Sequence, residues 1–310
     1  MGAGGAHGRR EGGLKPAARI GALFSGDASH PSYPAFREGL AAMGYVEGRD
    51  ISIEARFDGG HLHRLPFLAA ELAASSVNLI AAIGAVHCRA AQEVAPSIPI
   101  VFAAVVDPVA VGLVGDPERP DRNATGVTTF DPDEARDGLR ILKRVVPRIE
   151  RLAILGDAGV PDALPLVSRA AAEAEGLRAQ VLLLRGEEDL EGAFVAMREE
   201  RADAVMGLAV PMVRVHGARI VELARAARIL TLFARDGAKF GPLLAYGTSF
   251  AAAARHMAGL MDRVLKGEQV SNIPIGRVVR PELLLNLPLA RSFGVMIPSD
   301  LMERATYTTR

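Results

Sequence analysis

The sequence predicts an α/β protein with two Rossmann-like lobes, each built on a parallel sheet, joined by a hinge. Short apolar or β-branched runs alternate with longer amphipathic segments, which is typical of βαβ units with right-handed crossovers. The alternation begins near residue 19, is interrupted by a polar stretch at 115–123, and restarts near residue 151. Two such halves in series predict a ligand cleft between two lobes.

In the first half, each expected strand is followed by a helix. The strands are apolar runs, and the helices repeat apolar residues every three or four positions. A short helix is expected after Asp107-Pro108. The expected strands are 19–24, 51–57, 77–83 and 98–103, and the expected helices are 33–43, 62–75, 86–94 and 109–114.

The second half follows a short strand at 126–129. Its expected helices are 134–145, 164–175, 190–199 and 213–226, and its expected strands are 151–155, 179–184, 204–207, 229–233 and 243–246. A long helix is expected at 249–266, where Gly267 suits the C′ position. Segments 273–279 and 283–287 look like a closing pair of strands. The first lobe should then comprise 18–126 with about 248–280, and the second 127–247 with about 281–310, after a disordered tail at 1–17.

The composition indicates a globular chain without a charged surface for nucleic acid or membrane. Of 310 residues, 49% are hydrophobic and 23% are charged, with 36 basic and 36 acidic side chains and no tryptophan. A neutral chain lacks the electrostatic footprint that nucleic acids bind, and no apolar run is long enough to span a membrane. No signal peptide is readable at 1–17. The single cysteine, Cys88, excludes an intrachain disulfide, and we expect it to be a small core residue.

Motifs for catalysis, metals and cofactors are missing from the sequence. There is no P-loop, dinucleotide fingerprint, nucleophile elbow, HExxH or EF-hand loop, so we expect no cofactor and no metal. His61 and His63 have a spacing that does not place both rings on one helical face. Ser25, Asp27 and His30 cluster after the first strand, but triad partners usually come from separate loops.

The informative positions are those where a strand ends and a helix begins. They offer a helix N-terminus at Gly84–His87 that can hold a carboxylate, together with acids, an arginine and tyrosines. That set suits a small polar or zwitterionic ligand with an aromatic or apolar body. Structural roles remain open, since Asp107 could cap a helix, Arg235 could pair with Asp236, and Tyr246 could be a core residue. His87 either contacts the ligand or faces solvent.

Several long motifs resemble one protein family. The segment 98–114, IPIVFAAVVDPVAVGLV, resembles the IPIVFxxVxDPVxxGLV stretch of ABC-transporter substrate-binding proteins of the tryptophan/tyrosine type. The likeness continues through RPDRNATGV at 119–127, GLAAMGYVEGRDI at 39–51, Tyr246-Gly247, VLKG at 264–267 and LLLNL at 283–287. It covers roughly residues 19–305, in order and at family spacing.

This resemblance implies a periplasmic-binding-protein-like fold of type I that captures a small solute and delivers it to a permease coupled to an ATPase. It implies no catalysis, a location in the periplasm or anchored to the membrane on its outer side, and a monomer. Of the residues that we expect to contact an amino acid-like or aromatic carboxylate ligand, most follow from the resemblance, and Tyr33 and His87 follow from their places at strand ends. The expected residues are Ser25, Tyr33, Gly84, Ala85, Val86, His87, Asp107, Thr128, Thr129, Pro211, Arg235, Asp236 and Tyr246.

Two other classes of protein remain open from the sequence. A cytosolic small-molecule sensor would share the fold of lactose-repressor-type ligand cores, although no basic helix-turn-helix precedes residue 19. A two-lobed lyase or racemase would need a base or a Schiff-base lysine in the cleft, and Lys239 is the lysine we would place there.

Overall fold

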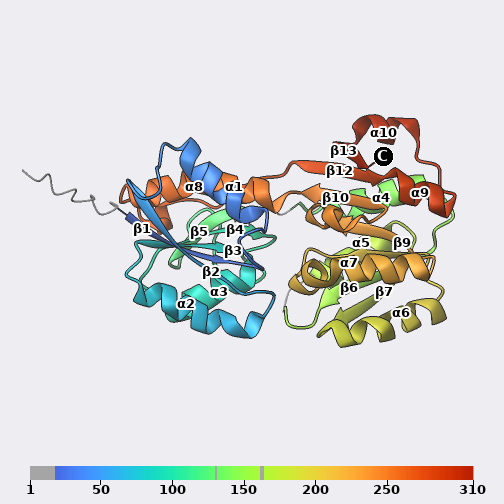
Figure 1. Cartoon of the computed structure of the whole chain (residues 1–310), viewed down its shortest axis with the longest axis horizontal. Coiled ribbons are helices and arrows are strands. Elements are labelled where there is room, and N and C mark those ends of the chain that lie inside the picture. The colour runs from blue at the N-terminus through green and yellow to red at the C-terminus, as the bar shows by residue number, and fades with distance from the viewer. Residues whose placement is uncertain (1–17, 130, 161–163, 310) are drawn as a thin grey trace, which may run out of the picture.

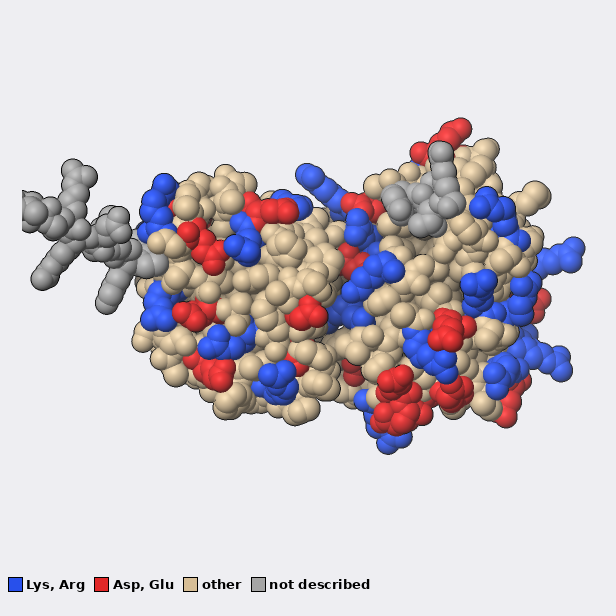
Figure 2. Space-filling model, in the orientation of Figure 1, with Lys and Arg blue, Asp and Glu red and all other residues tan. Residues whose placement is uncertain are grey.

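The computed structural model describes residues 18–129, 131–160 and 164–309, which form two α/β lobes lying side by side (Figure 1). The two α/β lobes are as the sequence predicted, and each contains one sheet with helices on both faces. The tail expected at 1–17 lies outside the described residues. Acidic and basic side chains are intermixed on the face shown in Figure 2, in keeping with their equal numbers.

The sheet of the first lobe has the strand order β11-β5-β4-β3-β1-β2, and its pairs are parallel. Every residue of β3 and β4 is buried, because these continuous apolar runs lie in the middle of the sheet with helices on both sides. Its strands are β1 (Ala18–Phe24), β2 (Ile51–Phe57), β3 (Leu79–Ile83), β4 (Ile100–Val105), β5 (Ala124–Thr128) and β11 (Gly276–Arg277).

Two pairs of helices cover this first sheet. Helix α1 packs against α8 on one face, and α2 lies beside α3 on the other (Figure 1). Although α8 comes from late in the chain, its Met257 and Met261 share one core with Phe36 of α1. The bounds are α1 (Ser32–Ala42), α2 (Leu65–Ala74), α3 (Ala85–Val94) and α8 (Phe250–Leu265).

The sheet of the second lobe has the order β13-β12-β10-β9-β8-β6-β7, in which β12 runs antiparallel to β10. Helices α4 and α5 pack together against it, and α6 packs with α7 (Figure 1). Its strands are β6 (Arg151–Asp157), β7 (Arg178–Leu184), β8 (Ala204–Gly207), β9 (Leu230–Ala234), β10 (Leu244–Thr248), β12 (Pro281–Asn286) and β13 (Tyr307–Thr309). Its helices are α4 (Glu134–Val145), α5 (Leu164–Ala174), α6 (Leu190–Glu199), α7 (Pro211–Ala226), α9 (Leu287–Phe293) and α10 (Ser299–Arg304).

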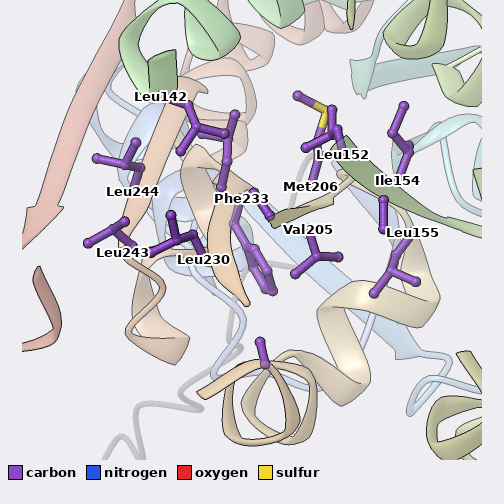
Figure 3. Packing of buried hydrophobic residues seen from close by; sticks show 14 of the residues in the cluster. Leu142, Leu152, Ile154, Leu155, Val205, Met206, Leu230, Phe233, Leu243 and Leu244 are labelled. Atoms are coloured by element: carbon purple, nitrogen blue, oxygen red, sulfur yellow. The ribbon is translucent and has the colours of Figure 1, made fainter. Parts of the chain in front are cut away.

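The core of the second lobe is packed around Phe233 of β9. Figure 3 shows Phe233 among aliphatic side chains of the neighbouring strands, with Leu142 of α4 nearby. A Cβ atom on Gly207 would lie 2.9 Å from the Phe233 ring, and one on Gly237 would lie 2.7 Å from it. The bare backbones at these two positions therefore make the room that the ring occupies.

The chain crosses between the lobes three times, after β5, after β10 and after β11. The third crossing corrects the prediction that 273–279 and 283–287 form one pair of strands. Instead β11 pairs with β5 of the first sheet, and β12 pairs with β10 of the second. The backbone between them is held at both ends, because Val278 N–H donates to Thr128 O and Arg280 N–H to Thr248 Oγ1.

The helix predicted at 109–114 is also wrong, since this segment forms turns. Asp107 Oδ1 accepts hydrogen bonds from the N–H groups of Val109 and Ala110, which starts one turn. Gly112 then has a φ of 70°, and Leu113 N–H returns to Pro108 O. A left-handed residue so early ends the turn before a helix can propagate.

A close approach of α1 to α8 gives a testable prediction about packing. A Cβ atom on Gly39 would lie 2.5 Å from the carbonyl oxygen of Arg255 and 2.9 Å from Ala258 Cβ. Gly39→Ala should therefore lower the free energy of unfolding by about 1–3 kcal/mol through overpacking. Gly259→Ala is the matched control, because that position in α8 has no neighbour within 4 Å of the new methyl group and should be neutral or stabilising. Equal urea midpoints for both variants would contradict the packing argument.

Candidate functional site

A cavity of about 210 Å³ lies between the two lobes, where the carboxyl ends of both sheets face each other. The first lobe contributes the start of α3 and the turn after β4, and the second lobe contributes the segments after β8 and β9. The segments that cross between lobes supply Thr129, Glu134, Thr248 and Phe250. The carboxyl ends of parallel strands are the usual ligand-binding edge of α/β sheets.

Most of the cavity wall is apolar. Valine, leucine and alanine side chains from both lobes line it, together with Met206, Phe233, Phe240 and Phe250. The volume is below the 300–1,000 Å³ that is usual for drug-sized ligands. The cavity therefore suits one small solute with an apolar body.

The start of α3 faces this cavity. Gly84 has a φ of 96°, which favours glycine, and it turns the chain from β3 into the helix. Gly84, Ala85 and Val86 all line the cavity. Because the first N–H groups of a helix have no partner within the helix, they form an electropositive surface suited to an anion.

Several predicted site residues lie in the cavity wall and also have structural partners there. Asp107 lines the cavity while its carboxylate caps the turn at Val109 and Ala110. Thr129, Pro211 and Tyr246 line it as well, and Tyr246 also belongs to the core of the second lobe. Asp107 and Tyr246 therefore both line the cavity and contribute to the structure around it.

Arg235 and Asp236 connect the cavity to a crossing segment. Arg235 pairs with Glu282 at 2.6 Å and with Asp236 at 3.3 Å. The other oxygen of Asp236 accepts the N–H of Phe250 at 2.7 Å, at the start of α8. Burial raises the pKa of Asp236 above its usual value. A second-lobe carboxylate thus holds the N-terminus of a helix that packs on the first lobe.

Four predicted site residues do not line the cavity, and each has neighbours elsewhere. Ser25 is buried at the end of β1. Tyr33 packs edge-on against Phe24 and Phe57 with ring centroids 5.5 and 5.0 Å away. The Thr128 hydroxyl donates to the carbonyl oxygens of Val105 and Val106.

The fourth, His87, is fully buried, which corrects the alternative that it faces solvent. Its Nε2 binds Asp58 Oδ2 at 3.0 Å, and its Nδ1 has no hydrogen-bond partner among the described residues. Asp58 is also fully buried, and its other oxygen accepts the N–H groups of Gly26 and Gly60. One carboxylate therefore ties together the loops after β1 and β2 and the first turn of α3.

Sequence reasoning missed Arg214, which lies in the first turns of α7 and lines the cavity. Its guanidinium carbon is 5.8 Å from the centre of the Phe250 ring, and its buried Nε has no hydrogen-bond partner among the described residues. An available signal was its position three residues after Pro211, which was itself predicted. Burial lowers the pKa of Arg214, while Asp58, Asp236 and Asp157 raise it.

Sequence reasoning also missed Glu134, at the start of α4. Its Oε2 accepts the N–H of Thr248 at 3.1 Å, and its Oε1 would lie 2.5 Å from a Cβ atom on Gly247. Gly247, with a φ of 131°, is therefore the residue that leaves room for this carboxylate. Burial raises the pKa of Glu134 to about 7, and the nearby acids Asp131 and Asp236 act in the same direction.

The segments tested for catalysis or metal binding have other contacts. Asp27 accepts from Ser29 rather than from His30, and burial lowers the pKa of His30 to about 4. The His61 and His63 rings lie 5.6 Å apart, but the described ranges contain no group of three or more His, Cys, Asp or Glu that could hold a metal ion. Cys88 is buried, as predicted, and burial raises its pKa. Across residues 18–129, 131–160 and 164–309, no helix is both long and apolar enough to span a bilayer.

The family model described as "ABC transporter substrate binding protein" matches residues 18–309, almost the whole chain. The chain belongs to this family. As predicted, this substrate-binding protein is therefore a member of a family of binding proteins rather than of enzymes. That membership favours neither the sensor nor the lyase alternative.

Individual relatives of this substrate-binding protein agree with the family match. It is 28% identical over 130 residues to a tyrosine-binding protein of Clostridioides difficile (strain R20291), a match that covers 41% of this chain and 37% of that protein. A Streptococcus pneumonia ABC domain in complex with L-Trp has the same fold, with a TM-score of 0.87, 21% identity, and coverage of 94% of this chain and 99% of that one. A ligand-free, open substrate binding protein from Clostridium difficile gives a TM-score of 0.68, 22% identity, and coverage of 94% and 100%.

Proposed function

We propose that this chain is the solute-binding component of an ABC importer and captures a small amino acid or aromatic carboxylate between its lobes. The observation that carries the proposal is the small apolar cavity walled by both lobes, with the N-terminus of α3 at its surface. An apolar wall suits a hydrophobic body, and free helix N–H groups suit a carboxylate. The names of the tyrosine-binding relative and of the L-Trp complex support the same ligand class.

Capture would work by a population shift between an open and a closed arrangement of the lobes. A ligand that touches both lobes stabilises the closed arrangement by its differential affinity. Two observations support a closed arrangement in this structure. The lobes touch at Gly60 and Val215 of α7, because a Cβ atom placed on Gly60 would lie 2.8 Å from the Val215 side chain. The TM-score is also higher with the L-Trp complex, at 0.87, than with the open, ligand-free structure, at 0.68.

The remaining expectations are part of the same proposal. The ligand would be contacted by the predicted residues that line the cavity, namely Gly84, Ala85, Val86, Asp107, Thr129, Pro211, Arg235, Asp236 and Tyr246. The protein would act outside the cytoplasmic membrane and present its ligand to a permease and an ATPase. Its lobes would be 18–126 with about 248–280, and 127–247 with about 281–310.

Thermal unfolding in the presence of single solutes tests this function. At a concentration one hundred times its Kd, a specific ligand adds about 2.7 kcal/mol to the free energy of unfolding, which for a chain of this length corresponds to a rise in Tm of about 4 °C. The panel comprises L-tryptophan, L-tyrosine, L-leucine, indole-3-propionate and phenylacetate, with ribose as the control. Equal Tm values with every solute at 1 mM would overturn the proposal.

A further inference from the structure

The cavity wall contains a basic and an acidic side chain whose charges are not paired with an oppositely charged neighbour in the described part of the chain. These are Arg214 of α7 and Glu134 of α4, neither of which forms an ion pair within the described residues. If the proposed function holds, their placement says more about the ligand than the apolar wall does.

The guanidinium carbon of Arg214 lies 5.8 Å from the ring centre of Phe250, a core residue of the first lobe at the start of α8. Asp58 is the acid that acts on it most strongly, and Arg214 in turn lowers the pKa of His87 in α3. The acids around Arg214 already have other donors. Asp58 accepts from Gly26, Gly60 and His87, Asp236 accepts from Phe250, and Asp157 accepts from Gly159 and Met212. The guanidinium, which has five N–H donors in a planar fork, therefore retains capacity for a further carboxylate.

Glu134 lines the same cavity at the start of α4, where the chain crosses between the lobes. The charged groups that act on it are Asp131 and Asp236, both acidic. One of its oxygens is held by Thr248 N–H, and the other lies over the bare backbone of Gly247. A partly buried carboxylate among like charges is stabilised most by a cation that enters the cavity.

We propose that Arg214 binds the carboxylate and Glu134 binds the ammonium of a zwitterionic ligand, so that the cavity selects an amino acid over the corresponding acid or amine. The N-terminus of α3 faces the same cavity and would share the carboxylate with Arg214. The apolar body would occupy the valine- and phenylalanine-lined wall. Because Arg214 belongs to the second lobe and α3 to the first, the carboxylate would join the two lobes.

The test is a cross of ligands and variants measured by calorimetry. The probes form two sets: L-tryptophan, tryptamine and indole-3-propionate, and L-leucine with isoamylamine and 4-methylpentanoate. The wild type should bind one amino acid about 100-fold more tightly than its acid and its amine, since a desolvated charge left unpaired is costly. Arg214→Met should weaken amino acid binding about 100-fold and leave the amine unchanged. Glu134→Gln should weaken amino acid binding similarly and leave the acid unchanged.

Matched controls separate recognition from a structural role. Arg219→Met changes a half-exposed arginine of the same helix that already pairs with Glu191 and Glu222, and Asp133→Asn changes the exposed acid next to Glu134. Both should bind like the wild type. Arg214→Lys and Glu134→Asp keep the charge if the first variants fold poorly, and they should retain most of the preference for the amino acid.

The outcomes separate this inference from the proposed function. If indole-3-propionate or 4-methylpentanoate binds as tightly as its amino acid, the zwitterion assignment is wrong while the carboxylate receptor stands. If Arg214→Met or Glu134→Gln weakens all three probes of a set equally, the residue has only a structural role and the assignment fails. If no probe binds at 1 mM, the proposed function and the inference both fail.

Discussion

Replacing His87 by alanine should lower the free energy of unfolding by about 3–5 kcal/mol. The change removes a fully buried ring and leaves a void. It also removes the hydrogen bond to Oδ2 of Asp58, so a buried carboxylate oxygen loses its partner. Burial lowers the pKa of His87 against the opposing effect of Asp58, so the neutral ring donates through Nε2. The measurement is urea unfolding at pH 7 followed by circular dichroism.

Two further variants test this explanation. His256→Ala removes an exposed histidine of α8 and should change the free energy by less than about 0.5 kcal/mol. In a double-mutant cycle of His87→Ala with Asp58→Asn, a coupling of at least about 1 kcal/mol is expected, because the two side chains are in contact. A loss below 1 kcal/mol for His87→Ala would show that the pair contributes little to the fold.

Glu134 should make the stability of the ligand-free protein fall as the pH rises from about 4.5 to about 7. Its pKa is raised from 4.5 to about 7 in the folded protein, mainly by burial. Between these values the folded state binds more protons than the unfolded state, so the free energy of unfolding decreases with pH. Since Glu134 is partly open to the cavity, the change should amount to about 1–3 kcal/mol, less than full burial would give.

The measurement compares wild type with Glu134→Gln between pH 4 and 8. As the pH rises from about 4.5 to about 7, the wild type should lose stability relative to Glu134→Gln. Titrating groups that do not interact with Glu134 act equally in both proteins and cancel in the difference. Glu118→Gln, at an exposed loop position, should give a flat difference. A flat difference for Glu134→Gln as well would show that the carboxylate is solvated like an ordinary surface acid.

Local patterns predicted most of the fold because each strand and helix has its own periodicity. The wrong elements lack such a signal. Strand β11 has two residues, and its partner β5 lies far away in the sequence. The turns at 109–114 depend on Asp107 accepting hydrogen bonds from two backbone N–H groups. The mostly apolar sequence of this segment does not indicate these bonds. The structure of these two segments is determined by long-range strand pairing and by side-chain capping, respectively.

The candidate site was predictable where backbone position alone determines it. The start of α3 and the ends of β4 and β9 were identified as strand ends, and they line the cavity. Arg214 was missed because it lies inside a helix, and only the orientation of α7 brings it to the cavity. Glu134 was missed because Thr248, its backbone partner, lies 114 positions away.

The late position of α8 has a consequence for the order in which the lobes can fold during synthesis. Strands β1 to β5 of the first sheet are synthesised long before the residues of α8 leave the ribosome. Until then, the apolar surface that packs against Met257 and Met261 remains exposed to solvent. By then five of the seven strands of the second sheet, β6 to β10, have been made. We therefore expect that the lobes do not fold one after the other during translation, and that an incomplete chain exposes an apolar surface prone to aggregation.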